Sequence, residues 1–143
     1  MNPYYPRWTA ALLKTMTKEA PIVVLTGPRQ VGKSTLLRNE LADNYKFIDL
    51  DDFELLGQIK QDPHPFLSMS DHLIFDEVQR APELLVSIKK LVDSNPNKRI
   101  ILSGSTNLLL MSKVADSLAG RAQFLHLAPM TVAELNKKSP PLW

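Results

Sequence analysis

The chain contains no cysteine, and this absence excludes disulfide bonds and thiolate metal sites. No apolar run approaches the ~20 residues of a membrane-spanning helix. Its 17 lysines and arginines are scattered among 15 acidic residues, so the sequence lacks the dense basic stripe that typically binds nucleic acid. Residues 1–7 also lack the pattern of a signal peptide. We therefore expect a cytoplasmic protein without a membrane or nucleic-acid partner.

Histidine clusters of the kind that hold metals are missing as well. His64, His72 and His126 do not have the spacing of metal ligands, so we expect structural or solvent-exposed roles for them. The rest of the composition is ordinary for a globular protein, with 44% hydrophobic and 22% charged residues. A length of 143 residues fits one domain with a core of its own.

The most informative segment present is residues 27–34, which read G-P-R-Q-V-G-K-S and form a complete G-x-x-x-x-G-K-S phosphate-binding loop. The two glycines, Gly27 and Gly32, permit a tight turn in which backbone N–H groups point inward and form an anion-binding nest. Lys33 is expected to reach the β- and γ-phosphates of ATP, and the Ser34 hydroxyl is expected to ligate Mg²⁺. The expected nucleotide-binding residues are Gly27, Pro28, Arg29, Gln30, Val31, Gly32, Lys33, Ser34 and Thr35.

The residues around this loop support the interpretation. Residues 22–26 form an apolar, β-branched run that is typical of a buried parallel strand. A helix is expected from Lys33, with Leu37 and Leu41 on one face, and its N-terminus adds a favourable dipole for phosphate. Strand, loop and helix thus occur in the order that phosphate binding requires. An ordinary glycine turn between a strand and a helix is the alternative.

A second motif follows at residues 72–77, where an apolar strand leads into Asp76 and Glu77. Ligands bind at the carboxyl edge of a parallel sheet, and Asp76 is placed there to hold Mg²⁺, chiefly through water. Glu77 is the candidate base that polarises water against the γ-phosphate. A carboxylate that merely precedes a turn is the alternative for either acid. Asp51 and Asp52 follow another strand, and we interpret them as a solvated turn.

Helices and strands alternate along the chain. Residues 61–66 are expected to form a loop, because a proline pair does not fit inside a regular element. The expected helices cover residues 7–18, 33–42, 53–60, 82–94 and 107–118, and the expected strands cover 22–26, 45–50, 72–77, 99–103 and 122–127. This order predicts a three-layer α/β domain with a mainly parallel five-stranded sheet.

The spacing of the two motifs narrows the class. A whole strand and a short helix lie between Lys33 and Asp76, which resembles the P-loop ATPases that have an additional inserted strand. GTPases carry an N-K-x-D guanine motif, and residues 136–139, N-K-K-S, fail it at the aspartate. An ATPase is therefore favoured over a GTPase.

Four segments together resemble a prokaryotic family of small AAA-type ATPases. These segments are residues 27–37, 75–80, 102–110 and 116–121, and the resemblance spans about residues 7–135. It implies a P-loop NTPase fold with strand order 5-1-4-3-2. Members of this family carry an ATPase core followed by a longer C-terminal domain of unknown function. We thus expect an arm and helix at 1–20, the core at 21–135, and a tail at 136–143 truncated before that second domain.

The resemblance also implies roles for polar residues after the fourth strand. Ser105 is the first choice for the sensor of the γ-phosphate and Asn107 the second, although a turn and a helix cap explain them equally well. Arg121 is a candidate arginine finger for a neighbouring subunit's nucleotide, the alternative being an ordinary surface arginine. A homo-oligomer or a protein partner would follow from a finger that acts in trans.

The expected function is Mg²⁺-dependent hydrolysis of ATP to ADP and phosphate, with Glu77, Lys33, Ser105 and Arg121 in catalytic roles and Ser34 and Asp76 on the metal ion. One alternative is a nucleotide-binding switch or interaction module with negligible turnover. Another is a small-molecule kinase, which would need an acceptor pocket and usually a basic lid. No arginine-rich segment is present to supply that lid.

Overall fold

The computed structural model describes residues 9–27, 33–41, 43–105, 116 and 118–126. Its helices are α1 (Thr9–Glu19), α2 (Lys33–Leu41), α3 (Phe53–Gln61), α4 (His64–Leu67), the 3₁₀ turn η1 (Val78–Arg80) and α5 (Leu84–Ser94). Its strands are β1 (Ile22–Gly27), β2 (Lys46–Asp49), β3 (His72–Asp76), β4 (Arg99–Ser105) and β5 (Ala122–His126). The expected helix at 107–118 falls almost wholly outside the described residues.

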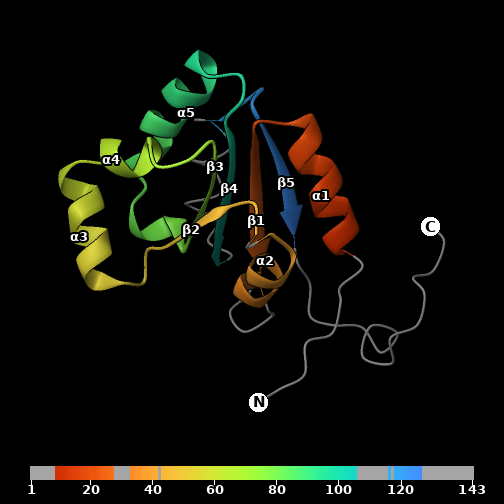
Figure 1. The fold of residues 1–143 in the computed structure, drawn as a ribbon, viewed down its shortest axis with the longest axis horizontal. Helices are drawn as coiled ribbons and strands as arrows, with labels where there is room; N and C mark the ends of the chain where they lie inside the picture. Colours follow the sequence, from red (N-terminus) through yellow and green to blue (C-terminus); the bar gives the residue numbers. More distant parts are fainter. Residues whose placement is uncertain (1–8, 28–32, 42, 106–115, 117, 127–143) are drawn as a thin grey trace.

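The five strands form one sheet in the order β2-β3-β4-β1-β5, and each neighbouring pair is parallel (Figure 1). This is the predicted order 5-1-4-3-2 viewed from the other side, so the expected fold class is confirmed. In such a sheet every strand ends at the same edge. The register places Gly27 beside Ser105 and Asp49 beside Asp76, so the ends of these four strands lie at that edge.

Helices cover both faces of the sheet, as Figure 1 shows. Alternate residues of β1 point to opposite faces. Ile22 and Val24 pack in a core with α3, α4 and α5, whereas Val23 and Leu25 pack in a second core with α1 and α2. The inner strand β1 is therefore buried on both faces, which explains its unbroken apolar sequence. No helix in the described part of the chain is long and apolar enough to cross a membrane.

The expected loop at residues 61–66 was wrong in part, because His64–Leu67 form the short helix α4. Pro63 is the N-cap residue and Pro65 lies in the first turn. Backbone N–H groups in the first turn of a helix have no partner inside it, so proline loses nothing there. Two prolines that were interpreted as breakers therefore mark a helix start.

Candidate functional site

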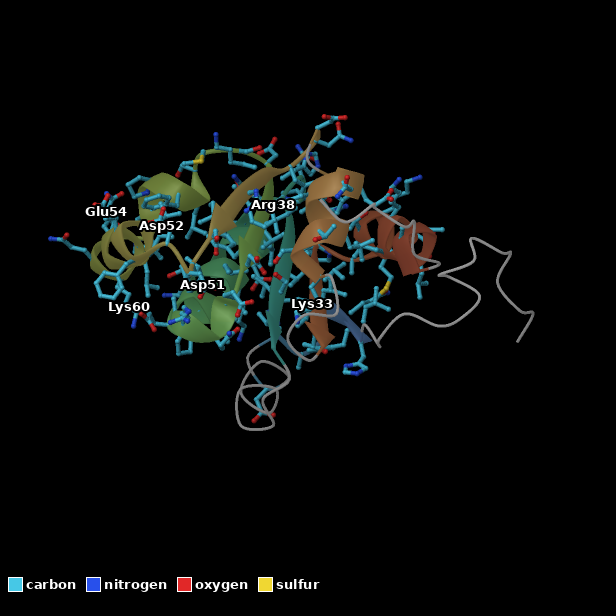
Figure 2. The ribbon with its side chains drawn as sticks, turned by 90° about the horizontal axis from the view of Figure 1, so that it is seen from below. Lys33, Arg38, Asp51, Asp52, Glu54 and Lys60 are labelled. Carbon is cyan, nitrogen blue, oxygen red and sulfur yellow. The ribbon has the colours of Figure 1, made fainter. Side chains whose placement is uncertain are left out.

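Lys33 begins α2 at the carboxyl edge of the sheet, close to the end of β1 (Figure 2). Its side chain is almost fully buried, and Nζ donates a 2.7 Å hydrogen bond to the carbonyl oxygen of Gly27. Burial lowers the pKa of the Lys33 amine, and the negative charges of Glu77 and Asp76 oppose that shift. A buried amine next to two carboxylates at a helix N-terminus is a suitable partner for phosphate oxygens.

Asp76 ends β3 and is only 4% exposed. Its Oδ2 accepts a 2.6 Å hydrogen bond from the Ser34 hydroxyl, which belongs to the first turn of α2. Its Oδ1 accepts hydrogen bonds from the Ser103 hydroxyl and from the backbone N–H of Glu77. Both carboxylate oxygens are thus fixed by neighbours from three parts of the fold.

The pair of Ser34 and Asp76 fits a magnesium site. Mg²⁺ prefers oxygen ligands, and it usually takes one or two from protein and the rest from water and substrate phosphates. A hydroxyl and a carboxylate in contact supply such a donor set. The described residues contain no group of three or more His, Cys, Asp or Glu side chains arranged around a metal.

The role of Ser103 was missed from the sequence. It lies in β4 next to Asp76 and is completely buried, and its hydroxyl donates to Asp76 Oδ1. A serine that follows three apolar residues in a strand carries little information by itself. The signal that could have revealed it is register: Phe75 pairs with Leu102, so the next positions, Asp76 and Ser103, are neighbours across the strands.

Glu77 follows the strand in a left-handed conformation, with φ of 58° and ψ of 45°. For a residue other than glycine this backbone costs on the order of 1–3 kcal/mol, and such residues cluster at functional sites. The 3₁₀ turn that follows packs against β4, and Glu77 Oε2 accepts a hydrogen bond from Gln79 Nε2 of that turn. Glu77 is half-buried directly after Asp76, and its carboxylate has Gln79 as a hydrogen-bond partner.

The structure describes only some of the remaining predicted site residues. Thr35 is exposed in the first turn of α2. Ser105 ends β4 with its backbone beside Gly27, but its side chain lies outside the described part of the structure. Asn107 and residues 28–32 of the phosphate-binding loop are also outside the described residues.

Arg121 lies at the opposite end of the sheet. Its carbonyl accepts a hydrogen bond from the N–H of Ile22, the first residue of β1, so the six-residue length of that strand, roughly 17 Å, separates it from Gly27. The guanidinium forms a bidentate pair with Asp93, with Nε–Oδ1 at 2.6 Å and NH2–Oδ2 at 3.0 Å. This pair lowers the pKa of Asp93 and raises that of Arg121. Arg121 is therefore out of reach of the candidate site of its own chain.

Two acids after β2 have structural partners. Asp52 caps α3 by accepting hydrogen bonds from the N–H groups of Glu54 and Leu55 at 3.1 and 3.2 Å. Asp51 pairs with Arg80 of η1. Figure 2 labels both acids where β2 leads into α3. Asp51 thus joins the turn after β2 to the turn that follows Glu77, whereas Asp52 stabilises the start of α3.

The histidines do not converge on a site. His72 packs its ring against Tyr45, with centroids 5.1 Å apart. His126 Nδ1 lies 3.4 Å from the Thr26 hydroxyl at the ends of β5 and β1.

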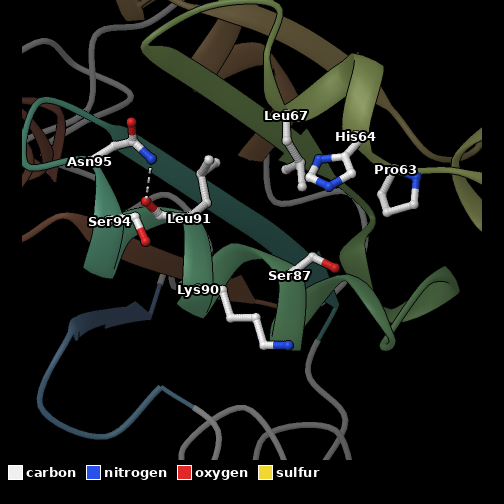
Figure 3. Close-up of a pocket in the computed structure, with 8 residues that line it drawn as sticks. All are labelled: Pro63, His64, Leu67, Ser87, Lys90, Leu91, Ser94 and Asn95. Atoms are coloured by element: carbon white, nitrogen blue, oxygen red, sulfur yellow. Dashed lines mark hydrogen bonds between the residues drawn. The ribbon is translucent and has the colours of Figure 1, made fainter.

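His64 lines a separate pocket of about 400 Å³ between α4 and α5. Figure 3 shows this pocket, with Lys90 and Ser94 of α5 among its lining residues. The helix α5 ends there, just before the first residue of β4. The pocket is therefore nearer the edge where the strands begin and is distinct from the candidate site.

Comparison with known proteins identifies a family and a fold. A family model described as an AAA domain matches residues 19–136. Uncharacterized proteins of Mycobacterium tuberculosis and Mycobacterium bovis are 33% identical to this chain over 144 residues, which cover 96% of this chain and 32% of each relative. An uncharacterized protein of Methanocaldococcus jannaschii is 26% identical over 81% of this chain and 28% of its own length. The chain thus spans about a third of the length of the curated relatives it matches.

Solved structures show the same fold. The chain is similar to a Walker-type ATPase of Pyrococcus abyssi, with a TM-score of 0.65 and 20% identity over 96% of this chain and 60% of that one. It is also similar to a DnaC helicase loader, with a TM-score of 0.52 and 17% identity over 87% and 93% of the two chains. At these identities the likeness concerns the fold alone.

Proposed function

Since this chain belongs to the prokaryotic AAA-type P-loop ATPase family, whose model is described as an AAA domain, we propose that it hydrolyses Mg²⁺-bound ATP to ADP and phosphate at the carboxyl edge of its sheet. The observation that carries the proposal is the contact between Ser34 and Asp76. It joins the phosphate-loop helix to the acidic strand end, and Lys33 of the same helix turn lies close enough for both carboxylates to influence its pKa.

Each residue has a distinct role in this proposal. Lys33 leaves the Gly27 carbonyl and donates to the β- and γ-phosphate oxygens, while Ser34 and Asp76 hold the magnesium ion. The ion, when bound, neutralises charge on the phosphates. Glu77 orients a water molecule and accepts its proton as the water oxygen bonds to the γ-phosphorus. The bond from that phosphorus to the bridging oxygen breaks, and ADP leaves with its electron pair.

The family resemblance makes Arg121 a candidate arginine finger, and an ordinary surface arginine is the alternative. In its own chain it lies at the far end of the sheet, so a finger role requires a second subunit. A finger that acts in trans contributes about 10³–10⁵ in rate. We therefore expect the isolated chain to turn over slowly, and a nucleotide-binding switch with negligible turnover is the second candidate function.

The proposal is tested first by thermal shift against ATP, ADP, GTP and buffer, each with Mg²⁺ and with EDTA. A larger stabilisation by ATP with Mg²⁺ than by GTP is expected. Phosphate release is then measured with ATP as the only phosphorylated compound and no acceptor present. Release without an acceptor identifies a hydrolase. Binding without release favours the switch, and release that needs an added acceptor favours a kinase.

A further inference from the structure

Gln79 is the direct partner of the candidate base. It lies in the middle of η1, and its Nε2 donates a hydrogen bond to Glu77 Oε2. The carboxylate determines which way the amide is oriented, because the opposite orientation would place two oxygens in contact. Gln79 Oε1 is consequently directed away from Glu77.

That oxygen is buried without a hydrogen-bond partner, and it is the one such side-chain atom in the described part of the chain. Leaving a buried carbonyl oxygen unsatisfied is unfavourable, and each case in a native fold calls for an explanation. Here the hydrogen bond to Glu77 accounts for the conformation. The amide is held in the orientation that serves Glu77, although its own oxygen gains no partner.

The Gln79 amide packs against the backbone of Gly104 in β4. A Cβ at Gly104 would lie 2.5 Å from Gln79 Oε1 and 3.8 Å from Val78 Cγ1. Any side chain at position 104 would therefore displace the amide. The preceding residue, Ser103, bonds Asp76. The end of β4 thus makes two contacts with the acidic motif. Ser103 bonds Asp76 directly, and Gly104 contacts Gln79, which in turn bonds Glu77.

We propose that Gln79, seated on Gly104, is a positioning residue that sets the orientation of the Glu77 carboxylate. The need for it follows from the backbone: Glu77 stands in a left-handed turn beyond the strand, and its side chain has three rotatable bonds. A base acts only within hydrogen-bond reach of the water that it deprotonates. This inference rests on the proposed ATPase function and adds to it the residue on which correct placement of the base depends.

The test is a set of variants measured for ATP affinity, KM and kcat. Gln79→Ala and Gln79→Leu are expected to lower kcat by up to about 100-fold, because a misplacement of a reacting group by about 1 Å can cost that much, with KM and ATP affinity nearly unchanged. Gln58→Ala, at an exposed glutamine of α3, is the matched control and should behave as the parent. In a Glu77→Gln background, Gln79→Ala should have no further effect.

Gly104→Ala provides an independent way to displace the amide. It should lower kcat as Gln79→Ala does, and the double variant should be no slower than Gln79→Ala, because an alanine at 79 does not reach the new methyl group. Thermal melting of each variant confirms that it is folded. Unchanged kcat in both Gln79 variants, or losses that multiply in the double variant, would overturn the positioning role alone. A parent that binds ATP but releases no phosphate would overturn the ATPase proposal as well.

Discussion

Ser34 and Asp76 are 42 positions apart in the chain, yet the hydroxyl of one donates a 2.6 Å hydrogen bond to the carboxylate of the other. The contact joins the first turn of α2 to the end of β3 at the carboxyl edge of the sheet. Both groups are oxygen ligands of the type that magnesium prefers. Their contact places the predicted metal-binding pair at a single point, next to Lys33.

Replacing Asp76 by asparagine should weaken ATP binding and its dependence on Mg²⁺ together. The amide removes a full negative charge from the pair while keeping the shape of the side chain, so the magnesium ion loses its strongest protein ligand. Titration of ATP by calorimetry at increasing Mg²⁺ concentrations checks this. An Asp76→Asn variant whose ATP affinity rises with Mg²⁺ as the parent's does would show that Asp76 is not a ligand.

Replacing Lys33 by alanine should abolish tight ATP binding. Charge-assisted hydrogen bonds contribute about 1.5–3 kcal/mol each, so the affinity is expected to fall by about tenfold to more than a hundredfold. Lys60→Ala is the control, because Lys60 is half-exposed on α3, 3.9 Å from Glu83, and Figure 2 shows it well apart from Lys33. Calorimetry measures the ATP affinity of the two variants and the parent. A Lys33→Ala variant that binds ATP as tightly as the parent would contradict the assignment of residues 27–34 as a phosphate-binding loop.

Replacing Ser103 by alanine should lower the free energy of unfolding by about 1–3 kcal/mol, because it removes a hydrogen-bond donor from the buried Asp76 carboxylate. Urea unfolding followed by circular dichroism measures the change. Ser87→Ala is the control at a half-buried serine of α5. If the two variants lose the same small amount of unfolding free energy, the Ser103–Asp76 hydrogen bond does not stabilise the fold as proposed.

Much of the fold was predictable from the sequence, because it depends on apolar periodicity. The run 22–26 and the order of motifs were sufficient for a parallel sheet with the phosphate loop after β1, a buried inner strand. Prolines were harder to interpret, since Pro63 and Pro65 occupy the start of α4, where the missing N–H is harmless.

The site was less predictable where it depends on contacts between strands. Lys33, Ser34, Asp76 and Glu77 could be found because they stand in motifs. Ser103 could not, because its role appears only when β4 is set beside β3 in register. The left-handed backbone of Glu77 likewise has no signature in the sequence, since the residues that follow it are not those of a typical tight turn.

If Arg121 is an arginine finger, it acts on a neighbouring subunit, and mixing two inactive variants tests this. Arg121→Ala keeps its own base, and Glu77→Gln keeps its arginine, so a mixed assembly contains sites with an intact base and an intact finger. Phosphate release by the mixture should exceed the sum of the two separate proteins and rise with protein concentration. Asp93→Ala, which frees Arg121 from its partner, should keep activity. A mixture no more active than its parts would contradict a role in trans.

The central claim is that Glu77 activates water at a site that binds ATP independently of it. The most direct measurement compares ATP affinity by calorimetry with phosphate release for the parent and Glu77→Gln at the same protein concentration. The amide is nearly isosteric but does not accept the proton, so release should fall by about 10²–10⁴-fold while ATP affinity stays within about twofold. Phosphate release at the parent rate by Glu77→Gln would contradict the account.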